Sequence, residues 1–235
     1  MRSEILTGAI VLALVFPHCV MVTDGIEVDV VYEAAAMPQA VLTDMGYRVK
    51  LDRALISLGR VELLECDNFV LQVWRLFVPG RAKAHEESTP TSLGVPMIID
   101  LMESSGAVLF AGTLRPPPGR YCGIRVVSAP ADADAIASTP ERADMLESVL
   151  VLEGVVEHSE TGLELPLRVR IAEVIEGDMP FDEPLVFDGP RSVTVSVRIN
   201  HIQWFDGIDF AVSAGAAVHQ KLVENMKSSL AAERL

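Results

Sequence analysis

The sequence predicts an all-β protein: an antiparallel, immunoglobulin-like β-sandwich that ends in a short helix. Three observations lead to this prediction. At least eight short segments have the residue pattern of strands and are separated by turn-forming residues. No alternation of strands with long helical segments and no repeat of fixed period is present. A single clear helical pattern occurs, at the C-terminus.

The strand segments are recognised by their alternation of apolar and polar residues. Ile26, Val28, Val30 and Tyr32 alternate with acidic residues, as in a strand with one buried face. Gly59 divides the long segment 47–66 and predicts a bend or bulge there. Further strands are expected within 69–78, 107–114, 121–128, 148–157, 164–175, 183–189 and 192–205, and a short element is expected within 97–103.

Three consecutive prolines, Pro116–Pro118, precede the strand expected to begin at Tyr121. Proline fixes φ and cannot donate a hydrogen bond to a sheet, so this stretch must run outside the ladder and pre-orders the approach to the strand. Alternation then predicts that Cys122 faces inward together with Ile124 and Val126.

Two polar stretches read as connections, and the last segment reads as a helix. Residues 80–96 are expected to form a long surface loop, and residues 129–144 a loop or weak helical turn. In 216–231, Val218, Leu222, Met226 and Leu230 are spaced four apart, on one face of a helix. No linker demands a second domain, so we expect one domain over 23–235.

The N-terminal segment 1–22 has the features of an export signal. An apolar run from Ile5 to Phe16 has the length of a signal-peptide core and is short for a membrane span. Cys19 follows it, in a position that resembles the lipidated cysteine of bacterial lipoproteins. A buried first strand or an uncleaved anchor remain as alternatives. We expect export to the periplasm or outer cell envelope, with membrane contact only through this leader or a lipid anchor.

Export would leave Cys66 and Cys122 as an even pair in an oxidising compartment, where a disulfide is expected. The alternative is two reduced, buried thiols.

Charge and motifs exclude several function classes. A net charge of −14 repels phosphate backbones, so nucleic-acid binding is not expected. Nucleophile-elbow, zincin, phosphate-loop, dinucleotide-binding and C-x-x-C motifs are all absent from the sequence. The protein is therefore not expected to be an enzyme, and no catalytic residue or cofactor is assigned.

Two histidine-containing segments remain as candidates for a site. His85 lies in a polar loop, and His201 lies in the segment 200–210 together with Trp204, Asp206 and Asp209. In one interpretation Trp204 and Phe205 close the core, and His201 points to solvent. In the other, the accessible His85 and His201 meet and bind a soft metal. Trp204 or Trp74 would then lie beside the metal.

The chain also resembles a known family. The segment 47–66, followed later by Pro117, Gly119, Tyr121, Gly123, Ile124 and Arg125 in order, is similar to exported β-sandwich proteins of the methanobactin-associated, copper-binding (MbnP-like) kind. This resemblance implies a copper site built from histidines and a modified tryptophan. The leading expectation is an exported or lipid-anchored, non-enzymatic binding or structural module of the cell envelope, with copper binding as the alternative. The ligand and partner are unknown.

Overall fold

The computed structural model describes residues 25–66, 88–94, 96–213 and 215–235. The predicted leader, the predicted strand at 69–78, and Cys19, Trp74 and His85 lie outside these ranges.

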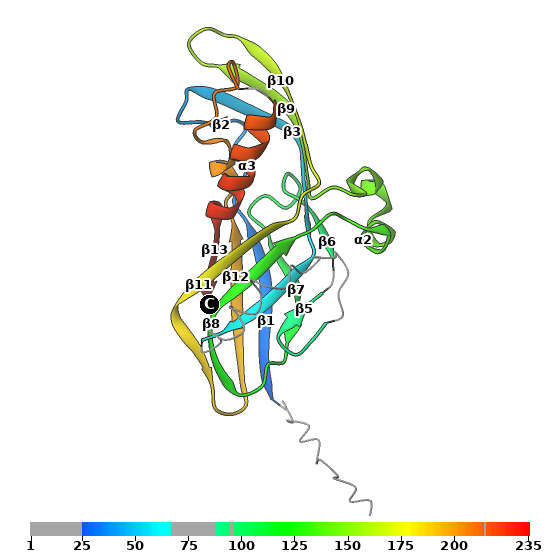
Figure 1. Cartoon of the computed structure of the whole chain (residues 1–235), viewed down its shortest axis with the longest axis vertical. Coiled ribbons are helices and arrows are strands. Elements are labelled where there is room, and N and C mark those ends of the chain that lie inside the picture. Colours follow the sequence, from blue (N-terminus) through cyan, green and yellow to red (C-terminus); the bar gives the residue numbers. More distant parts are fainter. Residues whose placement is uncertain (1–24, 67–87, 95, 214) are drawn as a thin grey trace, which may run out of the picture.

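The described chain forms three β-sheets (Figure 1). Sheet A has the order β13 (Leu230–Arg234), β12 (Arg191–Ile199), β1 (Ile26–Ala34), β7 (Val108–Leu114). Sheet B has the order β10 (Glu164–Ile171), β9 (Leu150–His158), β3 (Tyr47–Leu58), β2 (Val41–Leu42), and β6 (Met97–Asp100) also pairs with β3. Sheet C has the order β11 (Ile175–Phe187), β8 (Gly119–Ser128), β4 (Arg60–Glu65), β5 (Ser92–Leu93). The helical elements are α2 (Ala133–Ser138), η1 (Pro140–Met145), η2 (His201–Phe205) and α3 (Gly215–Ser229).

The prediction of an all-β sandwich is confirmed, with one difference in strand direction. Strand β1 pairs in parallel with β12, whereas every other described ladder is antiparallel. Parallel pairing needs a long connection, and most of the chain lies between these two strands.

Sheets A and C face each other across the main core. Inward residues of β1 belong to the same buried cluster as those of β4, β8 and β12. At one edge of the sandwich Leu93 of β5 lies close to Gly112 of β7, and at the other Leu230 of β13 lies close to Gly177 of β11. Sheet B and α3 lie at one end of the molecule, the upper end of Figure 1.

The predicted bend at Gly59 is where the chain changes sheets. Strand β3 ends at Leu58 in sheet B, and β4 begins at Arg60 in sheet C. The Gly59 amide donates to the Val127 carbonyl at 2.8 Å. One continuous stretch of sequence therefore joins the two sheets.

The prediction that Cys122 faces inward beside Ile124 and Val126 is wrong because the strand is bulged. In both ladders of β8 the pairing passes from Gly123 directly to Tyr121 and leaves out Cys122. Tyr121 is therefore buried and Cys122 only half-buried. Strand β8 also begins at Gly119, two residues earlier than expected, although Pro116–Pro118 run outside the strands as predicted.

The segment 201–205 is a 3₁₀ helix and does not continue β12 as a strand. His201, Trp204 and Phe205 are all buried, and a strand would point the adjacent Trp204 and Phe205 to opposite faces. A helical turn brings residues three and four apart to one face, so all three side chains reach the core.

The C-terminal helix ends earlier than predicted. Helix α3 covers Gly215–Ser229, and Leu230 begins β13, which pairs with the edge of β12. Leu222 and Met226 of the predicted face are buried, and Val218 is half-buried. The backbone groups at the edge of β12 explain the change, because a paired strand satisfies them.

Two other features, in β11 and β5, were not expected. Strand β11 begins at Ile175, so it includes residues that the sequence placed in a connection. The described part of the predicted 80–96 loop contains the short strand β5. The segment 129–144, predicted as a loop or weak helical turn, contains the helical turn α2 and most of η1, with Asp132 accepting hydrogen bonds at the N-terminus of α2.

Candidate functional site

The rings of His201 and Trp204, which both lie on η2, are in contact. The two rings are 6.1 Å apart between centroids and meet edge to face. Trp204 Nε1 donates to Ser229 Oγ at 2.8 Å, and Ser229 Oγ donates to the Met226 carbonyl at 2.9 Å. Trp204 thus fixes η2 to the end of α3, which agrees with the interpretation that it closes the core.

His201 is 1% exposed, so the prediction that it is accessible to solvent is wrong. Burial lowers its pKa, since an apolar environment disfavours the charged imidazolium. The Ile199 carbonyl opposes this shift. It does not complete a hydrogen bond of normal geometry, and neither ring nitrogen has such a partner among the described residues.

The other described histidines occupy different elements. His158 ends β9, where its ring meets the Tyr47 ring edge to face at 5.0 Å and Nδ1 accepts from the Glu160 and Thr161 amides. His219 lies on α3. Within the described ranges, no three His, Cys, Asp or Glu side chains gather as metal ligands. The predicted meeting of His201 with His85 lies outside what the structure describes.

Two side-chain hydrogen bonds hold the segment that follows Trp204 against residues 44–47, at the start of β3. Tyr47 Oη donates to Asp209 Oδ1 at 2.6 Å, and this hydrogen bond lowers the pKa of Asp209 and raises that of Tyr47. Asp44 Oδ1 accepts from the Gly207 amide at 2.6 Å. Burial, and then the nearby Asp44, raise the pKa of Asp206. The hydrogen bonds of Asp209 and Asp44 therefore join the 206–211 segment to the start of β3.

Sequence reasoning missed Tyr47, and it also missed Tyr32 as the lining of a cavity. The chain has only three tyrosines, and all three are buried. Each lies at an inward position of a strand, where a phenol must satisfy its hydroxyl as well as pack its ring. That position was the signal available in the sequence.

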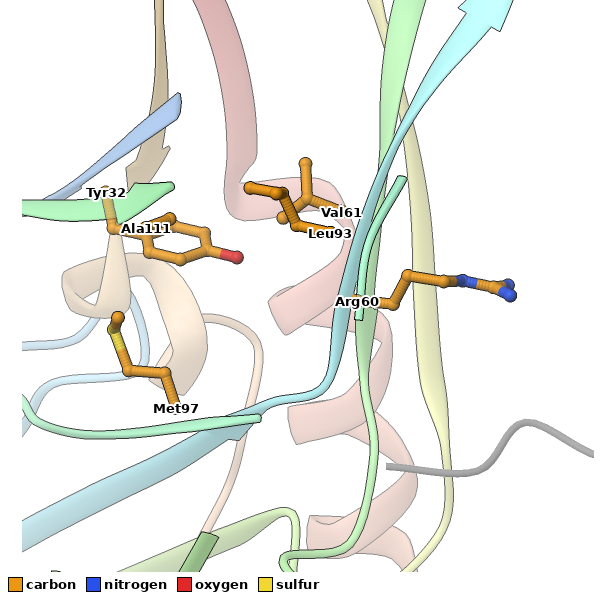
Figure 2. A pocket seen from close by; sticks show the side chains of 6 residues that line it. All are labelled: Tyr32, Arg60, Val61, Leu93, Met97 and Ala111. Carbon is orange, nitrogen blue, oxygen red and sulfur yellow. The ribbon is translucent and has the colours of Figure 1, made fainter. Parts of the chain in front are cut away.

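A small cavity lies between sheets A and C at the β5–β7 edge. Tyr32, Val61, Leu93, Met97 and Ala111 line it, together with the stem of Arg60. In Figure 2 the Tyr32 hydroxyl points into the cavity toward Leu93 and Val61, while the Arg60 guanidinium points away from it. Burial raises the pKa of Tyr32, so its phenol stays protonated. The cavity volume of about 10 Å³ is close to the minimum for one water molecule, which is too little for an organic ligand.

Comparison with protein-family models, with curated proteins and with solved structures finds no match. In the part of the chain that the structure describes, no helix combines the length and apolar character needed to cross a membrane.

Proposed function

We propose that this protein is an exported or lipid-anchored, non-enzymatic module of the cell envelope that binds a partner or ligand. The observation that carries the proposal is the disulfide between Cys66 and Cys122, whose Cα atoms are 4.8 Å apart. Disulfides persist in oxidising compartments and are rare in the cytosol. The apolar run at 5–16 supplies the export signal that such a location requires.

The roles of the polar side chains support a binding module rather than an enzyme. His201 is enclosed in the core, Asp209 is held by Tyr47, and Asp132 caps α2. Asp209 and Asp132 stabilise local structure and His201 is closed off from solvent, and the sandwich around them is a frame on which binding surfaces are commonly carried.

Fractionation of cells that express the tagged full-length chain tests the proposal. We expect the protein in the envelope fraction, with Cys66 and Cys122 protected from alkylation until a reductant is added. If Cys19 is lipidated, Cys19→Ala will move the protein from the membrane to the soluble envelope fraction. Cytosolic protein with alkylatable thiols would contradict the proposal.

Copper binding is the second candidate, favoured by one observation. The buried imidazole of His201 lies against Trp204, and its nitrogens lack hydrogen-bond partners among the described residues. A neutral imidazole nitrogen with a free lone pair can coordinate copper. In this candidate His201 and His85 would hold the ion. Calorimetric titration with copper, on the natural chain and on His201→Gln, tests it. Absence of binding, or equal binding by both, would exclude a role for His201.

A further inference from the structure

Three connections lie side by side at one end of the molecule, and we call them the apical loops. They lead into β3, join β9 to β10, and lead from η2 toward α3, and they comprise residues 42–46, 159–164 and 206–213 (upper end of Figure 1). The Gly46 carbonyl accepts from the Ser159 amide at 2.9 Å and from Ser159 Oγ at 2.6 Å. On the other side, Asp44 accepts from the Gly207 amide. Met45 stands between Asp44 and Gly46 in sequence, so it lies where the three loops meet.

The apical loops expose apolar side chains that their own folding does not require. Among the described residues nine large apolar side chains are exposed, and four of them belong to these loops: Leu42, Met45, Leu163 and Val212. The turn at Met45 is closed by the Thr43 amide, which donates to the Tyr47 carbonyl at 2.8 Å. The turn before Leu163 is closed by the His158 amide, which donates to the Leu163 carbonyl at 2.9 Å. Polar side chains would serve these turns equally well, so the exposed apolar ones indicate a contact with another molecule.

The apical loops are also held in place before any partner binds. The hydroxyl of the buried Tyr47 donates to Asp209 and accepts from the Ala211 amide at 3.2 Å, next to Val212. A surface that is already ordered loses little conformational entropy on binding, which favours affinity. Loops carried on a rigid β-sandwich are a common place for binding sites.

The charges beside the exposed apolar side chains define the kind of partner. The apical loops contain five carboxylates and no lysine or arginine. Glu160 and Glu164 are exposed, and their carboxylates make no ion pair or hydrogen bond within the described part of the chain. Arg48, the nearest basic residue in sequence, lies opposite Glu157 in the β3–β9 ladder. The surface is therefore apolar and negatively charged, which complements apolar side chains flanked by lysine or arginine and repels the phosphates of lipids.

We propose that the apical loops bind a partner protein through an apolar segment of that partner that is flanked by lysine or arginine. The proposal rests on the proposed function as a binding module, and it names the surface and the class of partner. Strand β1 begins at the opposite end of the molecule, the lower end of Figure 1. A leader that precedes β1 would therefore leave the apical loops facing away from the membrane, where a partner protein can reach them.

Fluorescence anisotropy of a labelled dodecapeptide of alternating leucine and lysine, titrated with the purified full-length protein, is the test. We expect Leu163→Ser to weaken binding about fivefold, the loss expected when half of a leucine side chain can no longer be buried. Leu146→Ser is the matched control, because Leu146 is 49% exposed and Leu163 47%, and Leu146 lies outside the apical loops. This control should bind as the natural chain does. Circular dichroism confirms that each variant is folded.

Two further peptides separate the apolar contact from the charge. A peptide of alternating serine and lysine keeps the charge, and one of alternating leucine and glutamate keeps the apolar side chains. Each lacks one of the two features, so each should bind at least about tenfold more weakly than the leucine–lysine peptide.

Absence of binding to the leucine–lysine peptide would overturn the proposal, and so would equal weakening by Leu163→Ser and Leu146→Ser. Equal binding of the serine–lysine peptide would also overturn it, since binding would then depend only on charge. If phosphatidylcholine vesicles, or a second copy of the chain, bind through Leu163 while the peptide does not, the surface has that occupant instead. None of these results depends on where the cell places the protein, so this proposal and the export proposal can fail separately.

Discussion

At the residue scale, His201 places an imidazole in the core whose two ring nitrogens have no hydrogen-bond partner among the described residues. It is buried, its pKa is lowered by that burial, and Trp204 packs against it. The folded state therefore binds the proton of His201 less tightly than the unfolded state does. The contribution of neutral His201 to the free energy of unfolding is fully present above the unfolded pKa of about 6.5, and it is lost as the pH falls below that value.

We therefore predict that the free energy of unfolding decreases between pH 7 and pH 5 by up to about 1.4 kcal/mol per pH unit through His201 alone. Urea unfolding at several pH values measures this, and His201→Gln should remove that part of the decrease. His158→Gln serves as the control, because His158 is only half-buried and lies at the end of β9, away from η2. The same pH dependence in natural chain and His201→Gln would show that His201 does not titrate in this range.

At the scale of elements, the bulged strands depend on glycines where the neighbouring backbone comes close. Asp52 is left out of the β3–β9 pairing, and opposite it a Cβ atom on Gly154 would clash with the Lys50 carbonyl oxygen and lie 2.9 Å from Leu51 Cα. Cys122 is left out of the β8 ladders in the same way, and a Cβ atom on the adjacent Gly123 would lie 2.6 Å from the Met179 carbonyl oxygen. Each bulge therefore restricts the residue beside it to glycine.

Gly154→Ala is predicted to lower the free energy of unfolding by about 2–3 kcal/mol, because backbone must move to admit the methyl group. Thermal or urea unfolding measures the change. Gly189→Ala is the matched control, since no atom lies within 4 Å of the added Cβ, and its effect should stay within about 0.5 kcal/mol. Equal stability of the two variants would show that β3 and β9 separate at the bulge without cost.

At the scale of the whole molecule, the disulfide joins the end of β4 to the bulge of β8. The two cysteines are 56 residues apart in sequence. Closing a loop of this length restricts the unfolded chain and stabilises the fold by about 4 kcal/mol in the chain-entropy description. The Tyr121 hydroxyl, which donates to the Pro117 carbonyl at 3.0 Å, attaches the proline stretch next to the same place.

Reduction of the disulfide is accordingly predicted to lower the free energy of unfolding by about 2–4 kcal/mol. Urea unfolding with and without a reductant measures the effect. The double variant Cys66→Ala, Cys122→Ala should unfold like the reduced natural chain and should not respond to reductant. A reductant effect that persists in the double variant would assign it to another group.

The sequence by itself determined the fold class, the bend at Gly59, the course of Pro116–Pro118 outside the sheets, and the Cys66–Cys122 pair. Each depends on local chemistry: alternation sets the buried face of a strand, proline cannot join a ladder, and only two cysteines follow residue 22. The strand at Ile26–Ala34 was recognised for the same reason.

Only the tertiary structure decided the parallel pairing of β1 with β12, the bulge at Cys122, the burial of His201 and the strand at Leu230–Arg234. These features depend on which segments meet across long stretches of chain. Residues 230–234 form a strand because they pair with the edge of β12. Cys122 is left out of the pairing of β8, so Tyr121 takes the core position that alternation predicted for Cys122. The surface groove lined by Glu173 and by Val223 and Lys227 of α3 has the same origin, because it forms only when α3 lies beside the β10–β11 connection.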